Sequence, residues 1–361
     1  MSGAQRFDAL DGLRGLAAVL VVLHHALSPF GLEKLWVAHA QLAVDFFFGL
    51  SGFVIGAAYE QRLRHGMGTG AFMLQRLLRL YPLMLTGLLF GLVVQAGRGQ
   101  APAGDLVTAL LFNTLWLPDL TAFVAGDGGT WPLNVALWSL STEMGLSLCF
   151  GLVGYRLSRR SLWCALGLAA LALAVLAFTL GGISGGHDRS TWWAGPVRGA
   201  YPFIAGLLLW HLHSRWRVSL HAAWAPLLLM LLLLLPMRAS PAGYELAAAW
   251  FGVPLVVALG ARSRSEGRLH AVNRMLGRLS FPLYALHYPI VQLGSAAARR
   301  LHGDSGLPLA VVVLAELGAA TGLALLVARY VDEPVRRWLA ARLTAAPPGP
   351  VPLPKVATRR A

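Results

Sequence analysis

Residues 10–30 read LDGLRGLAAVLVVLHHALSPF, a segment long and apolar enough to cross a lipid bilayer as one helix. The segment nevertheless contains Arg14 and the adjacent histidines His24 and His25. Arg14 and His25 are eleven positions apart, so at about 100° per residue they lie within about 20° of each other on one helix face. Because a charge is costly inside a membrane, this polar stripe indicates either a side chain that reaches the interface or a site buried in a helix bundle.

The composition extends this pattern to the whole chain. Of its 361 residues, 57% are hydrophobic and 13% are charged, and the mean hydropathy is +0.61. Such values are not those of a soluble globular domain. We therefore expect an all-α fold, a polytopic membrane helix bundle with about ten transmembrane helices. The predicted spans are residues 10–30, 41–59, 72–96, 133–155, 162–180, 196–211, 222–237, 244–260, 279–298 and 307–330. The apolar segment 105–117 is too short to span and predicts an interfacial or re-entrant piece.

The charge of the chain indicates topology rather than a nucleic-acid partner. The formal net charge is +14, and most arginines fall in short loops between apolar segments. If both termini are cytoplasmic, these loops follow the positive-inside rule, so we expect an N-in, C-in, multi-pass protein of the inner (cytoplasmic) membrane. The transmembrane domain is predicted at 7–340, and the Pro-rich segment 341–361 is predicted to be a disordered cytoplasmic tail. Cys149 and Cys164 have no metal-binding spacing, so no metal is expected.

A histidine and two carboxylates fall at similar depths in the predicted spans. His25, Asp45 and Glu143 would all lie in the outer half of the membrane, at depths that agree within roughly 3 Å. A histidine beside a carboxylate suits general base catalysis, because the carboxylate fixes the tautomer and stabilises the imidazolium. The alternative is structural: Asp45 would cap its helix and Glu143 would bond to a neighbouring one.

Three arginines lie instead near the predicted cytoplasmic face. Arg14, Arg76 and Arg79 would form a cationic inner mouth, which suits a ligand that carries phosphate groups. The alternative for Arg76 and Arg79 is that they are ordinary positive-inside residues. After Asp45 in the sequence, Gly49 and Gly52 are about one helical turn apart and predict a close helix approach, with Ser51 free to bond across the interface.

Two classes of function fit this arrangement. An integral membrane enzyme would use the arginines for a cytoplasmic donor and His25 for chemistry. A proton-coupled secondary transporter would instead relay protons through His25, Asp45 and Glu143 and use Arg14 as a counter-charge for its substrate. Composition and topology fit both classes.

Six ordered segments resemble the acyltransferase-3 family of integral membrane O-acyltransferases, and the resemblance covers residues 7–338. The first, LRGLAAVLVVLHHA at 13–26, contains the family's pattern of an arginine, ten residues and a histidine. The others are VDFFFGLSGFVIG at 44–56, RLLRLYP at 76–82, LWSLSTE at 137–143, LSFPLYALHYPI at 279–290 and DEP at 332–334. The step Phe281-Pro282 departs from the Ser-Tyr that family members often have.

The resemblance implies transfer of an acyl group, usually acetyl, from cytoplasmic acyl-CoA to a hydroxyl of an extracytoplasmic glycan, glycolipid or related acceptor. It implies acyl-CoA as donor substrate, no bound cofactor, and the bilayer as surroundings; the oligomeric state is not predicted. The implied catalytic residues are His25, its functional partner Arg14, and Glu143. The implied acyl-CoA-binding residues are Arg14, Arg76 and Arg79. The positions implied to support the site are Asp45, Ser51, Trp138, Ser139, Tyr284 and His287.

Overall fold

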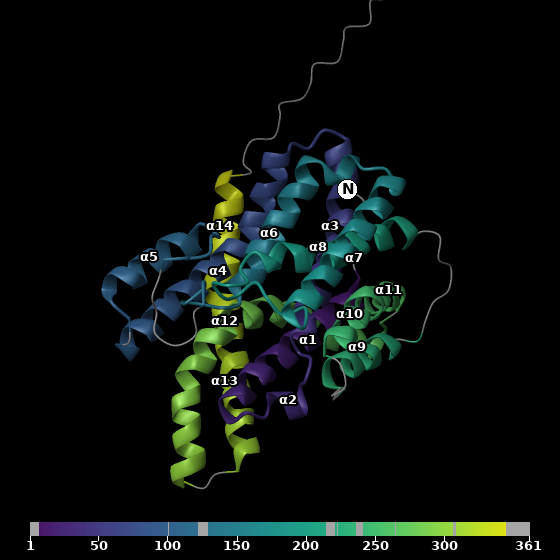
Figure 1. Ribbon diagram of the computed structural model, residues 1–361. Helices are drawn as coiled ribbons and strands as arrows, with labels where there is room; N and C mark the ends of the chain where they lie inside the picture. Colours follow the sequence, from purple (N-terminus) through teal and green to yellow (C-terminus); the bar gives the residue numbers. More distant parts are fainter. Residues whose placement is uncertain are drawn as a thin grey trace, which may run out of the picture.

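Every regular element that the structure describes is helical. The computed structural model describes residues 7–99, 101–121, 129–213, 221, 223–235, 241–263, 265–305 and 308–343, and this part of the chain contains no strand (Figure 1). The predicted all-helical class is therefore confirmed. In chain order, the elements are α1 (Asp8–Leu27), η1 (Ser28–Phe30), α2 (Glu33–Trp36), α3 (Leu42–Arg64), α4 (Thr69–Arg98), α5 (Ala103–Thr114), α6 (Leu137–Leu152), η2 (Gly154–Arg156), α7 (Arg159–Leu180), α8 (Ala194–His213), α9 (Trp224–Leu234), α10 (Pro241–Ala247), the π-helical η3 (Ala248–Gly252), α11 (Val253–Arg262), α12 (Gly267–Ser305), α13 (Leu309–Val327), the π-helical η4 (Ala328–Asp332) and α14 (Glu333–Leu343).

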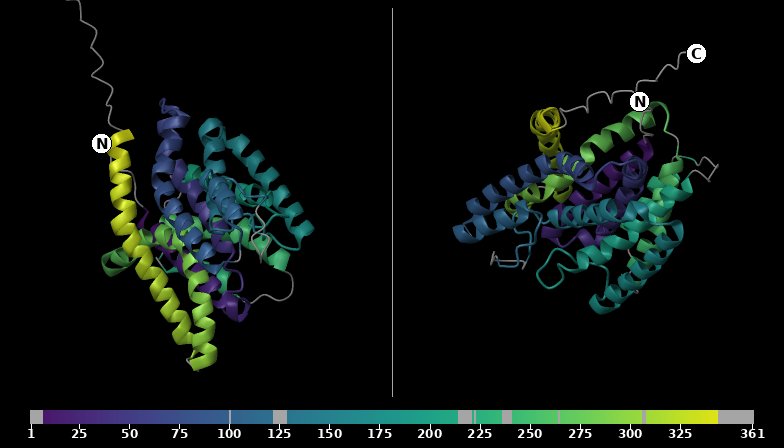
Figure 2. Two further views of the ribbon diagram at one scale, coloured as in Figure 1. Left: turned by 90° about the vertical axis from the view of Figure 1, so that its left-hand side faces the viewer. Right: turned by 90° about the horizontal axis from the view of Figure 1, so that it is seen from above.

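Helix α1 is paired with α12, although more than 200 residues separate them in sequence. Gly12 and Gly15 let the two helices approach, since a Cβ at Gly15 would lie 2.5 Å from the backbone oxygen of Leu276. Helix α12 then turns into α13, and η4 and α14 continue α13 as one long rod along the side of the molecule (Figure 2). This pairing places the polar stripe of α1 against α12.

Helices α3 and α8 form the second close pair. A Cβ at Gly52 would lie 2.0 Å from the carbonyl oxygen of Phe203, and a Cβ at Gly206 would lie 2.0 Å from that of Gly49. Only glycine permits backbones to meet at such distances, as small residues do in membrane helix pairs. The close approach predicted for Gly52 is therefore observed.

Six helical stretches in the described residues are long and apolar enough to cross a membrane. They expose large apolar side chains, as lipid-facing helices do; for example, Leu168 is 70% exposed, Phe178 80% and Leu314 65%. The six are Asp8–Phe30, Leu42–Arg64, Thr69–Arg98, Arg159–Leu180, Ala242–Arg262 and Leu309–Leu339. The other four predicted spans correspond to α6, α8, α9 and part of α12, of which α6 has 16 residues and α9 has 11. The count of ten is thus not confirmed.

Two remaining sequence predictions concern α5 and the C-terminus. Helix α5 is a 12-residue helix that projects from the body and exposes apolar side chains such as Leu111 (Figure 1). Its length agrees with a segment that does not cross the bilayer. Of the predicted tail, residues up to Leu343 belong to α14, and residues 344–361 lie outside the described part of the chain.

Candidate active site

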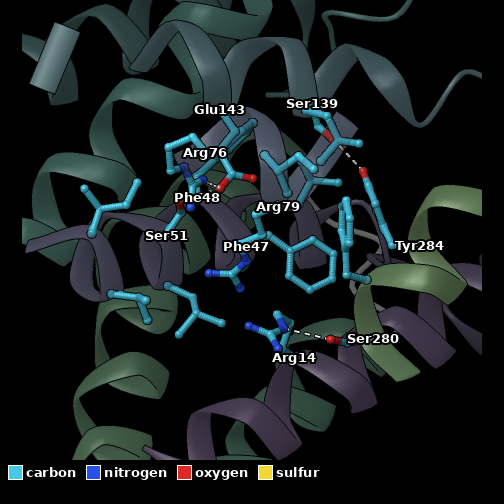
Figure 3. A pocket seen from close by; sticks show the side chains of 17 residues that line it. Arg14, Phe47, Phe48, Ser51, Arg76, Arg79, Ser139, Glu143, Ser280 and Tyr284 are labelled. Carbon is cyan, nitrogen blue, oxygen red and sulfur yellow. Dashed lines mark hydrogen bonds and ion pairs between the residues drawn. The ribbon is translucent and has the colours of Figure 1, made fainter. Parts of the chain in front are cut away.

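Three arginines line a cavity between α1, α3, α4, α6 and α12, which we call the arginine cavity. Its volume is about 90 Å³, and Arg14, Arg76 and Arg79 converge on it from two helices (Figure 3). Its other polar lining residues are Ser51, Ser139, Glu143, Ser280 and Tyr284, and its apolar lining includes Phe47 and Phe48. The structure therefore brings together the three arginines that the family resemblance implied for acyl-CoA binding.

Glu143 lies in this cavity and is held by two partners. Its Oε1 atom contacts Nη2 of the buried Arg76 and accepts a hydrogen bond of 2.7 Å from Ser51 Oγ. The predicted bond from Ser51 across the helix interface is thus observed, with α6 as the other side. This carboxylate neutralises Arg76 and fixes its position.

The other two arginines differ in their partners. Arg14 donates hydrogen bonds to Ser280 Oγ at 2.7 Å and to the Gly277 carbonyl at 3.1 Å, and it forms an ion pair of 3.1 Å with Asp11. Arg79 is exposed to the cavity and forms no ion pair or hydrogen bond with any described residue. The arginine cavity therefore carries an uncompensated positive charge at Arg79, which favours an anionic ligand.

A second cavity, the histidine cavity, adjoins the first. Its volume is about 410 Å³, and Val44 and Tyr284 line both cavities and thus form part of a common wall. The Tyr284 hydroxyl lies 2.6 Å from Ser139 Oγ, which fixes the tyrosine in this wall. The polar residues that line the histidine cavity are His24, His25, Ser28, Glu33, Lys34, Gln41, Ser184, His187, Arg198, Tyr284 and His287, and Trp138 is also part of its wall.

His25 faces His287 across the interface between α1 and α12. The ring centroids are 5.2 Å apart and the rings are inclined by 36°, while the ring of Tyr288 lies 5.5 Å from His25. His287 is 1% exposed, and its Nδ1 lies 2.8 Å from the carbonyl oxygen of Tyr284. The predicted polar stripe therefore runs from Arg14 in one cavity to His25 in the other.

The expected meeting of His25 with Asp45 and Glu143 does not occur. Glu143 lies in the arginine cavity, whereas Asp45 is completely buried and binds Arg198 of α8 through three hydrogen bonds of 2.6 to 3.2 Å. Each carboxylate is thus paired with an arginine, because a buried carboxylate needs a countercharge more than a neutral histidine can supply.

Arg198 is a buried charged residue of this site that the sequence did not predict. Its guanidinium is 2% exposed, donates to the Gln41 carbonyl at 2.7 Å and lies over the Trp138 ring at 5.5 Å. A signal was present, since one apolar segment contains Arg198 and another contains Asp45, and buried charges in membrane segments normally pair. Sequence alone does not show which segments are neighbours.

The loop between α7 and α8 contributes Ser184 and His187 to the wall of the histidine cavity. It carries His187, whose carbonyl accepts hydrogen bonds from the backbone and hydroxyl of Thr130. The neighbouring Asp188 is partly buried, which favours the neutral form of its carboxyl group. Hydrogen bonds from Ser190 and Thr191 nevertheless hold the pKa of this carboxyl below its usual range. Asp188 is therefore ionised at neutral pH and organises the turn that follows His187.

These features describe a membrane protein with an anion-attracting cavity next to a cavity that contains a histidine. Comparison with known families agrees: the family model of the acyltransferase domain Acyl_transf_3 matches residues 7–329. The chain therefore belongs to the acyltransferase-3 family, as the six sequence segments indicated.

Three curated relatives are similar to the chain, and two of them are named as acyl- or acetyltransferases. The chain is 34% identical to "Protein 2 in picA locus" of Rhizobium radiobacter over 49% of this chain and 97% of that protein. It is 29% identical to "Acyltransferase MdmB" of Streptomyces mycarofaciens over 94% of both chains. It is 24% identical to "Putative peptidoglycan O-acetyltransferase YrhL" of Bacillus subtilis over 91% of this chain and 54% of that protein. No solved structure matches the chain.

Proposed function

We propose that this acyltransferase moves an acyl group, in the first instance acetyl, from cytoplasmic acyl-CoA to a hydroxyl of a glycan, glycolipid or related acceptor on the opposite side of the membrane. The observation that carries the proposal is the pair of adjoining cavities, one lined by arginines and the other by histidines, with Val44 and Tyr284 in their common wall. A donor and an acceptor that arrive from opposite sides would meet at this wall.

The arginine cavity is the proposed donor site. Arg14, Arg76 and Arg79 bind the phosphate groups of CoA, and Arg79 is the most available because it forms no ion pair with a described carboxylate. The pantetheine arm would lie along the apolar lining of Phe47 and Phe48. It would carry the thioester toward Tyr284. Glu143 keeps Arg76 in place.

His25 is the proposed catalytic residue. As a general base, it takes the proton of the acceptor hydroxyl while the oxygen attacks the thioester carbonyl carbon. The carbon–sulfur bond then breaks, and the CoA thiolate leaves and receives the proton from the His25 imidazolium. Alternatively, His25 first accepts the acyl group and then passes it to the hydroxyl. Both routes release CoA as the free thiol.

The name of one relative supports an oxygen acceptor, and that of another supports acyl transfer alone. The Bacillus subtilis relative is named as a putative peptidoglycan O-acetyltransferase and the Streptomyces mycarofaciens relative simply as an acyltransferase. We extend the O-acylation to this chain and place it in the inner membrane with both termini cytoplasmic. Residues 7–340 would form the catalytic domain.

The transporter hypothesis has no observation in its favour. It requires protons to pass between His25, Asp45 and Glu143, but each carboxylate is engaged by an arginine and a proton would have to displace that partner. Membership of an acyltransferase family also favours group transfer over transport.

The test is release of free CoA from acetyl-CoA by the full-length protein in inverted membrane vesicles that contain native acceptors. We expect CoA release together with labelled acceptor when the acetyl group is radioactive, and loss of both in His25→Ala at equal protein level. Wild-type vesicles that consume no acetyl-CoA, or a His25→Ala variant with normal transfer, would contradict the proposal.

A further inference from the structure

We infer that His287 is the positioning residue that orients the imidazole of His25 for catalysis. In many histidine-dependent enzymes a carboxylate has this role. The inference rests on the proposed function, because it assigns a role within the same acyl transfer. The argument for it is that some groups around His25 can still form a hydrogen bond and others cannot.

None of three nearby carboxylates contacts His25: Glu33 lines the same cavity but is not among the described contacts of the His25 ring. Asp45 is occupied by three hydrogen bonds from Arg198, and Glu143 lies in the other cavity with Arg76 and Ser51. In the described part of the chain, the His25 ring makes contacts with the rings of three residues and no hydrogen bond. Of those three residues, His24 and His287 each have a buried ring nitrogen with no hydrogen-bond partner among the described residues, and Tyr288 has no such atom.

The tautomer of His287 follows from its backbone contact. Its Nδ1 lies 2.8 Å from the carbonyl oxygen of Tyr284, and because a carbonyl can only accept, Nδ1 must carry the hydrogen. In a neutral imidazole the other nitrogen then has a lone pair. That nitrogen, Nε2, is buried and has no hydrogen-bond partner among the described residues. A buried acceptor without a donor is costly, so this atom is suited to receive one.

His25 is the donor that lies opposite. With centroids 5.2 Å apart, facing nitrogens of the two rings can come within hydrogen-bond distance after a small rotation. An N–H of His25 that donates to Nε2 of His287 leaves the second nitrogen of His25 with its lone pair. That lone pair is then available in the histidine cavity for the hydroxyl proton of the acceptor.

His24 is the competing candidate, since its ring lies 5.3 Å from His25 and its Nδ1 is also buried without a partner. Consecutive residues on a helix point about 100° apart, however, so their nitrogens diverge. His287 projects from α12, which packs face to face with α1. The geometry therefore favours His287 over His24.

In the reaction, His287 remains neutral throughout. The acceptor hydroxyl gives its proton to the free nitrogen of His25, its oxygen bonds to the thioester carbonyl carbon, and the bond from that carbon to sulfur breaks. The resulting His25 imidazolium is stabilised by its hydrogen bond to His287 and then protonates the CoA thiolate. The products are the acyl ester and CoA, with no net change in either histidine.

The experiment compares His287→Gln with His287→Leu in the same vesicle assay with radioactive acetyl-CoA. Glutamine offers an N–H for the Tyr284 carbonyl and an oxygen that can accept from His25, whereas leucine offers neither. We expect His287→Leu to lower kcat by about 100-fold, with the KM for acetyl-CoA changed less than about threefold, and His287→Gln to recover most of the kcat loss. A His287→Leu variant as active as His287→Gln would overturn the inference.

Further variants test whether the kcat loss depends on which buried histidine is removed. His39→Leu removes another buried imidazole, one outside both cavities, and should leave kcat unchanged. His24→Leu with a kcat loss equal to or above that of His287→Leu would assign the role to His24 and overturn the inference. If His287→Leu does not reach the membrane at the wild-type level, His287→Met tests the same loss with a more adaptable side chain.

The outcome also distinguishes this inference from the proposed function. A wild-type protein that transfers no acetyl group refutes the function and the inference together. An active wild type with fully active His287→Leu and His287→Met variants refutes the inference alone and leaves the function in place.

Discussion

Arg79 has a different environment from the other two arginines of its cavity, because no described carboxylate forms an ion pair with it. Arg79→Gln should therefore weaken the binding of a phosphate-bearing donor without removing a structural contact. We expect the KM for acetyl-CoA to rise by about tenfold, as for the loss of about 1.4 kcal/mol of uniform binding, with kcat little changed. Steady-state kinetics at several donor concentrations measures this effect.

Arg62 provides the matched control for Arg79. It is exposed at the end of α3, donates to Gln75 and lies over the Tyr59 ring, so it belongs to the positively charged loops but lines neither cavity. Arg62→Gln should leave the KM for acetyl-CoA unchanged. Equal increases in KM for Arg62→Gln and Arg79→Gln would show a general surface-charge effect instead of a donor site.

The ion pair of Asp45 and Arg198 has a structural role, which is measured by stability rather than by enzyme kinetics. Both side chains are at most 2% exposed, and removal of one partner leaves the other charge buried without compensation. Asp45→Asn should therefore destabilise the protein by about 3–5 kcal/mol. The double variant Asp45→Leu with Arg198→Met should recover much of that loss, because the buried charge is removed as well.

Thermal unfolding in detergent measures these differences. Asp45→Asn that unfolds at the wild-type temperature but has no transferase activity would instead place Asp45 in the chemistry.

The common wall of the two cavities should set the length of the acyl group. Val44 lines both cavities beside Tyr284, which its bond to Ser139 holds in place. Val44→Ala removes two methyl groups from this wall and so enlarges the space for the acyl group. We therefore expect kcat/KM for butyryl-CoA relative to acetyl-CoA to rise by about tenfold. Val54 lines the arginine cavity alone, so Val54→Ala should leave this ratio unchanged. A ratio that shifts equally in both variants would count against the wall.

At the scale of residues, the sequence predicted which helix face a side chain occupies better than it predicted which residue of another helix that side chain contacts. The spacing of Arg14 and His25 placed both on the face of α1 that contacts α12, and Ser51 does bond across its interface. The pairing of Asp45 with Arg198 joins positions 153 residues apart. Helical periodicity fixes which face a side chain occupies, but it contains no information on which distant helix covers that face.

At the scale of elements, the contact of α3 with α8 depends on glycine. A methyl group at Gly52 would lie 2.0 Å from the Phe203 carbonyl oxygen, so Gly52→Ala must push the two helices apart. We expect a loss of about 1–3 kcal/mol in stability, as for other overpacked sites. Thermal unfolding and the yield of folded protein measure this loss.

Gly167 is the control for Gly52. It lies within α7, where an added Cβ would meet nothing within 4 Å. Gly167→Ala should therefore be neutral or slightly stabilising, since alanine favours the helix. A destabilisation of Gly167→Ala similar to that of Gly52→Ala would refute the close-packing explanation.

Helix α12 shows what periodicity and hydropathy missed among the elements. The sequence predicted a span at 279–298, but the helix begins at Gly267 and ends at Ser305. Its first turns contain Arg268, Arg274 and Arg278 and therefore resemble a loop by hydropathy. They are helical because Asn273, Leu276 and Gly277 pack against the start of α1, a tertiary contact that the sequence pattern does not reveal.

At the scale of the whole molecule, transfer across a membrane requires the two cavities to open on opposite sides. The loop between α3 and α4 contains the exposed His65 at the end of α3, the helix that extends from the arginine cavity. The loop between α7 and α8 contains the exposed Arg189 next to His187 of the histidine cavity. If both termini are cytoplasmic, the first loop is cytoplasmic and the second is not.

Accessibility of single cysteines tests this arrangement. In a background where Cys149→Ala and Cys164→Ala remove the two exposed native thiols, a membrane-impermeant maleimide should label Arg189→Cys but not His65→Cys in intact spheroplasts. Inverted vesicles should give the opposite result. Labelling of both positions from one side would mean that both cavities face the same compartment, and the donor and acceptor could not then arrive from opposite sides of the membrane.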